Sequence, residues 1–274
     1  MNLAQIRKNH RVKQLHGKPR SRIVNVFFTL GAVLFALVGW YAITRWTKLP
    51  EFLIPSPERV WNRFIVSLEN GVLLEHTLST FAEVIGGLFI GISIAAVLGY
   101  LLAKSHSIER LLAPFIVASQ SIPIVAIAPL LIIWFGSGRL SKVLISALIV
   151  FFPVLVNTIV AVRSVPEDLT DLMRSLQATR WQIFTKLEIP AALPVLFGGL
   201  KIGATLSVIG AVVGEFVAAD EGLGFLINTA RGMYDTPMVF VAVITLIGMA
   251  LILYSLVGIL EGRLLYWREV PNKK

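Results

Sequence analysis

The chain has 274 residues, of which 56% are hydrophobic and 15% charged, and its formal net charge is +9. A composition this apolar excludes an ordinary soluble domain, because too few polar side chains exist to cover its surface. The sequence contains no cysteine, which excludes a disulfide framework, a thiolate metal site and a cysteine nucleophile.

A basic segment precedes the first apolar stretch and contains no acidic residue. This pattern is typical of a cytoplasmic flank that contacts anionic membrane lipid, so the positive charge does not require nucleic acid as a partner. The apolar stretch that follows is too long for a secretory signal. The basic residues of the segment are Arg7, Lys8, Arg11, Lys13, Lys18, Arg20 and Arg22.

Six apolar stretches are long enough to cross a bilayer, which takes about 20 helical residues for roughly 30 Å of hydrocarbon. The sequence therefore predicts an all-α, polytopic transmembrane helical bundle with about six spans. The stretches cover residues 24–43, 78–103, 111–135, 143–162, 195–218 and 239–260.

Six spans place both termini in the cytoplasm and the acidic loop 48–77 outside. Two prolines in that loop predict a turn before an interfacial helix near residues 59–68. The turn that carries Arg139 and Lys142 also falls outside, against the positive-inside rule. Because orientation follows the summed charge bias, we keep this topology and note the exception.

The third stretch contains Pro114, Pro123 and Pro129. Each proline removes a backbone donor and kinks a helix. Broken helices often line a translocation path, although simple curvature of the bundle explains the prolines equally well. Gln120, Pro123 and Pro129 are therefore candidates for a pathway or gate.

Small residues recur in the second stretch, where Gly87 and Gly91 are followed by Ala95 and Gly99. Small residues four apart let helices approach closely. The pattern is compatible with packing inside one subunit and with a homodimer seam.

Ionisable residues are scarce in the apolar stretches. We expect Glu83 to reach interfacial water and the long Lys201 side chain to extend to the inner interface. Glu215 lies toward the outer end of the fifth stretch and is a candidate for a pathway or gate residue.

Catalytic motifs are missing from the sequence. Residues 136–142 are the nearest approach to a phosphate-binding loop, but they lack its Gly-Lys-Ser/Thr ending. No His-Glu-x-x-His sequence occurs, and no histidine lies in a span where it could serve a serine as base. We therefore expect no catalytic residue, metal or cofactor in this chain, and no ATP hydrolysis by it alone.

A polar segment, residues 171–194, separates two of the apolar stretches. Leu169, Leu172 and Leu176 recur in it at helical spacing, and Trp181 and Phe184 begin a second stripe. An apolar stripe on a cytoplasmic loop is a candidate docking surface for another protein. The alternative, an amphipathic helix on the inner leaflet, fits less well because the neighbouring carboxylates repel anionic lipid.

Residues 171–194 resemble the cytoplasmic "EAA" loop of type I ABC-importer permeases. Asp171 stands at the acidic position of that loop, and residues 187–194 resemble its closing segment. Residues 121–138 and 214–227 are similar to the nitrate/sulfonate/taurine branch of the family. The resemblance implies contact with an ATPase through Asp171, Leu172, Met173, Leu176, Gln177, Ala178, Arg180, Trp181 and Phe184.

Two positions depart from the family pattern. Leu172 and Met173 replace its paired alanines, and Gln177 replaces a glycine that joins two short helices at a bend. Gln177 fits such a bend if its φ stays negative or if some strain is accepted.

The resemblance implies an importer permease in the bacterial inner membrane. Its expected partners are two copies of a cytoplasmic ATP-binding subunit, a periplasmic or lipid-anchored solute-binding protein, and a second copy of this chain. Riboflavin or a thiamine-precursor pyrimidine is one solute class, while sulfonates, taurine and nitrate stay open. A secondary carrier or channel that works without an ATPase is the alternative.

The expected domains are a basic cytoplasmic tail (1–23), a first span (24–46), an outer loop with an interfacial helix (47–73), a core permease domain (74–264, with its coupling loop at about 163–194) and a cytoplasmic tail (265–274).

Overall fold

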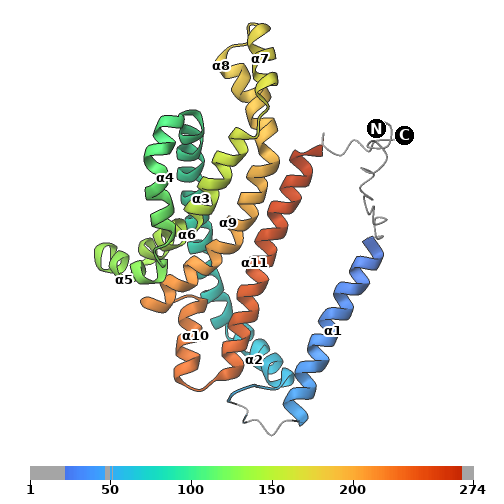
Figure 1. Cartoon of the computed structure of the whole chain (residues 1–274). Helices are drawn as coiled ribbons and strands as arrows, with labels where there is room; N and C mark the ends of the chain where they lie inside the picture. Colours follow the sequence, from blue (N-terminus) through green and yellow to red (C-terminus); the bar gives the residue numbers. More distant parts are fainter. Residues whose placement is uncertain (1–21, 47–49, 51, 267–274) are drawn as a thin grey trace, which may run out of the picture. The chain divides into compact units, whose positions relative to one another are not determined.

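A computed structural model describes residues 22–46, 50 and 52–266 of the chain (Figure 1). The two expected cytoplasmic tails lie outside these ranges, apart from residues 22–23 and 265–266. The described secondary structure is entirely helical, which confirms the all-α prediction. The helices are α1 (Arg22–Trp46), α2 (Pro57–Glu69), α3 (Val72–Lys104), α4 (His106–Gln120), α5 (Ile124–Phe135), α6 (Arg139–Arg163), α7 (Glu167–Ser175), α8 (Arg180–Ile183), the π-helical turn η2 (Phe184–Glu188), α9 (Ile189–Val217), α10 (Leu223–Gly232) and α11 (Thr236–Leu264).

The chain divides into two units, residues 1–57 and 58–274. In the first unit, α1 contains the expected first span, and the indole N–H of Trp40 donates to the carbonyl of Pro55 at 3.1 Å. The second unit holds the remaining helices, including α2 at the position where a helix was expected after the outer turn.

Four helical segments of the second unit are long and apolar enough to cross a membrane: α3, α6, α11 and the continuous run from α8 to α9. They confirm the second, fourth, fifth and sixth expected spans. Helix α1 has 25 residues, and its part from Gly31 to Trp46 is apolar.

The third expected span is not a single helix. It consists of α4 and α5, whose axes differ by 93° across a short break. Pro123 explains the break, because a proline disfavours helical geometry at the residue before it and cannot donate to the preceding turn. Pro114 and Pro129 lie inside α4 and α5 without ending them.

Small residues let α3, α6 and α9 pack tightly. A Cβ atom added at Gly91 would lie 2.7 Å from the Ala147 carbonyl oxygen, and one at Gly99 would lie 2.7 Å from Thr158 Cβ. The small-residue stripe of α3 therefore packs on α6 inside one subunit, which settles the choice that the sequence left open. The buried core around it contains Ala95, Val150, Val154 and Leu155.

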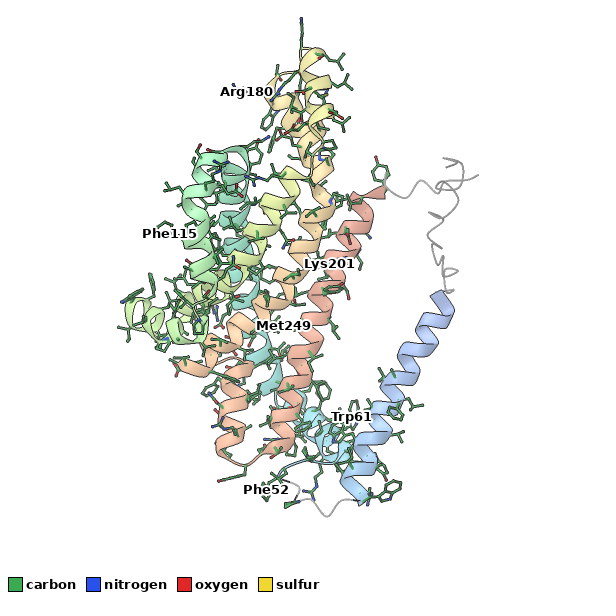
Figure 2. The ribbon with its side chains drawn as sticks, viewed as in Figure 1. Phe52, Trp61, Phe115, Arg180, Lys201 and Met249 are labelled. Atoms are coloured by element: carbon green, nitrogen blue, oxygen red, sulfur yellow. The ribbon has the colours of Figure 1, made fainter. Side chains whose placement is uncertain are left out.

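The second unit has two distinct ends (Figure 1). Helices α7 and α8 form one end, beside the last residues of α3 and α6, and α10 lies at the other. Figure 2 shows Arg180 at the α7–α8 end, with Lys201 and Met249 farther along the bundle.

Candidate functional site

The candidate site is the α7–α8 end, where two short helices meet at a sharp turn. Pro166 precedes α7, and Glu167 and Asp168 lie in its first turn, where carboxylates favour a helix N-terminus. The helix ends at Ser175, four residues before the N-cap of α8.

Gln177 forms the turn in a left-handed conformation, with φ 57°. The Ala178 N–H donates to the Met173 carbonyl at 3.0 Å, and the Gln177 N–H donates to the Arg174 carbonyl at 2.9 Å. This pair of bonds is the Schellman motif, in which glycine is the usual left-handed residue. The sequence left two options for Gln177, a negative φ or a strained conformation. The structure has the strained one.

Helix α8 begins directly after this motif with a capping box. The Gln182 N–H donates to Thr179 Oγ1 at 3.3 Å, and the Thr179 N–H donates to Gln182 Oε1 at 2.8 Å. The Thr-x-x-Gln spacing is a known sequence signature of a helix start, and the sequence reasoning missed it. Two consecutive capping motifs thus fix the directions of α7 and α8.

An exposed apolar stripe (Leu169, Leu172, Leu176 and Trp181) crosses both helices. Leu176 is 69% exposed and Trp181 is 70% exposed. Asp171 and Arg174 form an exposed ion pair at 3.0 Å beside the stripe. Of the other residues expected in ATPase contact, Gln177 and Arg180 are exposed, while Met173, Ala178 and Phe184 are partly buried.

The second apolar stripe connects the site to the bundle. The Phe184 ring lies 5.6 Å from the Trp181 ring and 5.1 Å from the Tyr100 ring of α3, centroid to centroid. Aromatic side chains therefore run without interruption from the exposed stripe to α3.

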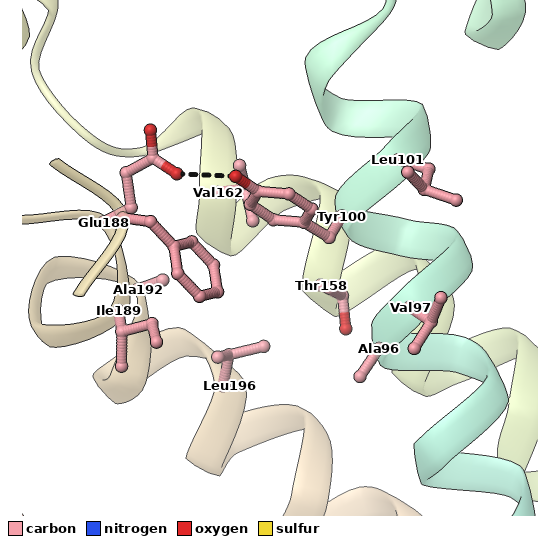
Figure 3. Close-up of a pocket in the computed structure, with 11 residues that line it drawn as sticks. Ala96, Val97, Tyr100, Leu101, Thr158, Val162, Glu188, Ile189, Ala192 and Leu196 are labelled. Carbon is pink, nitrogen blue, oxygen red and sulfur yellow. Dashed lines mark hydrogen bonds between the residues drawn. The ribbon is translucent and has the colours of Figure 1, made fainter. Parts of the chain in front are cut away.

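Glu188 of η2 makes a second connection that the sequence did not reveal. Its carboxylate accepts a hydrogen bond from the Tyr100 hydroxyl at 3.1 Å (Figure 3). It accepts another from Lys104 Nζ at 2.5 Å. Beneath it lies an almost entirely apolar cavity of about 350 Å³ between α3, α6, η2 and α9. Nearby, Arg163 at the end of α6 pairs with Glu109 of α4. We call η2 the root of the site. Ion pairs thus connect this root to α3 and the end of α6 to α4.

Glu215, a candidate pathway or gate residue, lies at the opposite end and is buried. Its carboxylate accepts hydrogen bonds from the Thr80 hydroxyl at 2.6 Å and from the Gly224 N–H at 2.5 Å. Thr80 Oγ1 in turn accepts from the Leu223 N–H at 2.7 Å. Gly222, with φ 111°, brings the backbone so close that any Cβ there would collide with the Glu215 carboxylate. Glu215 therefore joins α9 to α3 and to the first turn of α10.

The expectation for Glu83 was wrong. Its carboxylate is fully buried and lies 3.4 Å from Lys142 Nζ of α6, because packing against α6 and α9 leaves no route to water. Arg139 pairs with Glu221 at 3.0 Å. Both cations that depart from the positive-inside rule in the expected topology therefore lie beside a carboxylate.

The other ionisable residue of the spans is Lys201, which also has a partner. Its Nζ lies 2.5 Å from Glu261 Oε2 of α11 and 5.6 Å from the centre of the Tyr254 ring. The sequence reasoning did not anticipate this pair.

The remaining pathway candidates lie around the break between α4 and α5. Gln120, the last residue of α4, lines two neighbouring cavities between α4, α5 and α6. Pro123 is the N-cap of α5, and Pro129 lies inside that helix. Among the described residues, no group of three or more histidine, aspartate or glutamate side chains is placed to hold a metal ion.

The sequence profile of one family matches residues 76–266, and its description is "Binding-protein-dependent transport system inner membrane component". The riboflavin transport system permease protein RibX of Chloroflexus aurantiacus is 49% identical over 86% of this chain and 88% of its own length. The formylaminopyrimidine transport permease protein ThiX of Halalkalibacterium halodurans is 35% identical over 86% of this chain and 94% of its own. The taurine transport system permease protein TauC of Escherichia coli is 27% identical over 91% of this chain and 92% of its own length.

Among solved structures, an inward-facing form of the MetNI methionine ABC transporter superimposes on this chain with a TM-score of 0.61. The sequence identity is 20%, and the match covers 70% of this chain and 96% of that one. At this identity the likeness shows the shared fold.

Proposed function

Because this chain belongs to the family of inner membrane components of binding-protein-dependent transport systems, we propose that residues 171–184 couple it to a separate ATPase. The chain is a permease component of an ABC importer, like its named relatives. Two copies would form the membrane pathway, and each would present its α7–α8 end to one of two cytoplasmic ATP-binding subunits. A periplasmic or lipid-anchored protein would deliver the solute to the other face.

The observation that carries the proposal is the exposed apolar stripe. Burying apolar surface is worth about 25 cal/mol per Å², so exposed leucine and tryptophan on a polar segment favour a partner that covers them. Two capping motifs hold α7 and α8 in fixed directions, as a preformed docking surface requires. A secondary carrier or channel gives no reason for such a surface.

Coupling then follows from the connections at the root of the site. Movement of the ATPase subunits would displace α7 and α8, and the Phe184–Tyr100 contact and the Glu188–Lys104 ion pair would carry the displacement to α3. Rigid-body rocking of helices in this way is the general basis of alternating access. Glu188 is thus a positioning residue in the proposal.

The topology is part of the same proposal. The core permease domain would span residues 74–264, with the α7–α8 end and both terminal tails in the cytoplasm and α10 outside. Residues 24–46 would form a first span and residues 47–73 an outer loop.

The solute is small, and the relatives suggest two chemical groups. The names of two relatives specify riboflavin and formylaminopyrimidine, and those of others specify taurine and aliphatic sulfonates. The proposed coupling is the same for either group.

Replacing Leu176 with Glu tests the docking surface. The substitution places a charge in the centre of the stripe without disturbing packing, because the side chain is exposed. We expect insertion into the membrane to be unchanged, while co-purification of the ATPase and solute uptake fall to background.

Met233→Glu is the matched control, since Met233 is 74% exposed and lies after α10 at the opposite end. It should leave ATPase co-purification intact. Normal uptake by the Leu176→Glu variant would refute docking at this surface.

A further inference from the structure

A cavity of about 390 Å³ lies where the break between α4 and α5 meets α6. Its walls are largely aliphatic and aromatic, among them Ile124, Ile149 and Phe152. Its polar residues are Ser119, Gln120 and Asn157, and no charged residue is among the described residues that line it.

The cavity lies at membrane depth. Pro153, which also lines it, is ten residues before the end of α6 at Arg163, and Gln120 is fourteen residues after the start of α4. At 1.5 Å per residue, these positions are roughly 15 Å and 21 Å from the helix ends at the α7–α8 end of the bundle. Both distances fall inside a hydrocarbon layer about 30 Å thick.

Two amides in the cavity have hydrogen-bonding capacity to spare. The Gln120 side chain is exposed, and its amide makes no hydrogen bond within the part of the chain that the structure describes. Asn157 Nδ2 donates to the Pro153 carbonyl at 2.8 Å, which leaves Asn157 Oδ1 as a free acceptor among the described residues. Hydrocarbon cannot satisfy an amide, and each unmade bond costs roughly 1–3 kcal/mol. Lipid chains are therefore a poor occupant of this cavity.

The cavity continues toward the α7–α8 end. A second cavity of about 550 Å³ shares Gln120 and Val156 with it and extends to Glu109, Arg163 and Ser164. Together they form a groove from the bend in the middle of the bundle to its cytoplasmic end in the proposed topology.

We propose that Gln120 and Asn157 are the polar contacts of a transient binding site for an uncharged, ring-bearing solute. The inference rests on the proposed function, which supplies the passage of a solute. Amides match the donors and acceptors on the edge of a flavin or pyrimidine ring, and Phe152 and Ile149 offer apolar surface to its faces. A sulfonate or nitrate would bring a charge that no lining residue compensates, at a high desolvation cost. A volume near 390 Å³ lies within the usual range for small-molecule sites.

Cysteine labelling tests the site, because the native chain has no cysteine. Gln120→Cys in the complete complex, reconstituted in nanodiscs, would be reacted with a water-soluble thiol reagent, with and without riboflavin or taurine. We expect labelling of Gln120→Cys that riboflavin slows about tenfold and taurine leaves unchanged. Thr245→Cys is the control; this residue of α11 bonds to its own helix through the Val241 carbonyl, and its labelling should not respond to riboflavin.

A second variant, Gln120→Leu, removes the amide at similar size. It should weaken riboflavin binding, followed by its fluorescence, about tenfold, as expected for the loss of one or two hydrogen bonds.

Several results would overturn the site. They are an unreactive Gln120→Cys, labelling that riboflavin does not slow, equal protection by taurine, or unchanged riboflavin binding by Gln120→Leu. If the complex hydrolyses ATP in those experiments, the proposed function stands and only the site fails. If the wild-type chain assembles with no ATPase, both fail.

Discussion

The two ends of the bundle differ in how they treat their polar and apolar side chains. At the α10 end, Glu83, Lys142 and Glu215 are buried, and their contacts join α3, α6, α9 and α10. At the α7–α8 end, leucine and tryptophan are exposed, and the ion pairs at the root are partly accessible. The first arrangement stabilises one packing of the helices. The second leaves an apolar surface that a partner would cover in the proposed function, and joins it to the bundle through a few contacts.

The largest effect should follow from breaking the buried pair at the α10 end. Lys142→Met leaves the Glu83 carboxylate buried without its cation, which typically costs about 3–5 kcal/mol. We expect a lower thermal unfolding midpoint of the purified protein. The double variant Glu83→Gln/Lys142→Met should recover part of the loss, because a buried pair replaced by neutral groups is often tolerated, while the Glu215 carboxylate stays buried at the same end. If the double variant is as unstable as the single one, the pair does not hold this end together.

Glu188→Gln tests the connection at the other end. It removes the charge that pairs with Lys104 while keeping an acceptor for the Tyr100 hydroxyl. We expect uptake to fall about fivefold or more, in the range of ordinary coupling energies, with ATPase co-purification unchanged. Glu261→Gln breaks the comparable Lys201 pair between α9 and α11 and serves as control. A Glu188 variant that transports normally would remove this residue from the coupling path.

Gln177→Gly should have a smaller and favourable effect on stability. Removing a left-handed non-glycine residue gains roughly 1–2 kcal/mol, and the greater freedom of glycine in the unfolded chain offsets about 0.5–1 kcal/mol of it. The net gain of up to about 1.5 kcal/mol should appear as a higher unfolding midpoint with transport retained. A loss of stability would mean that the Gln177 side chain contributes more than its backbone costs.

The smallest effect concerns the exposed pair of Arg139 and Glu221. The hydrogen bond from Arg139 lowers the pKa of the Glu221 carboxyl below its ordinary value. The stabilisation is therefore fully present above the ordinary pKa and is lost as pH falls through the lowered one. Because both side chains are largely exposed, it should amount to less than about 1 kcal/mol. Unfolding of wild type and Arg139→Gln at neutral pH and near pH 3 should show a difference that shrinks in acid.

Local features of the molecule could be predicted from the sequence, and pairings between distant residues could not. Apolar length identified α3, α6, α9 and α11, and apolar spacing identified the stripe around Leu176. Pro123 marked a break, but the 93° bend also depends on how α4 and α5 pack on α6. Glu83 and Lys142 are 59 positions apart (142 − 83), and no local sequence pattern indicates that they are in contact. The capping box at Thr179 could have been recognised from the sequence but was missed. The Glu188 contacts join residues far apart in the sequence and could be seen only in the fold.

Contact between Leu176 and the ATPase is the central claim. Leu176→Cys, the only cysteine in this chain, would carry a photoactivatable crosslinker in membranes that contain the whole transporter. The account predicts an adduct with the ATP-binding subunit at Leu176→Cys and none at Met233→Cys. A transport-competent complex in which Leu176→Cys forms no adduct with that subunit would contradict it.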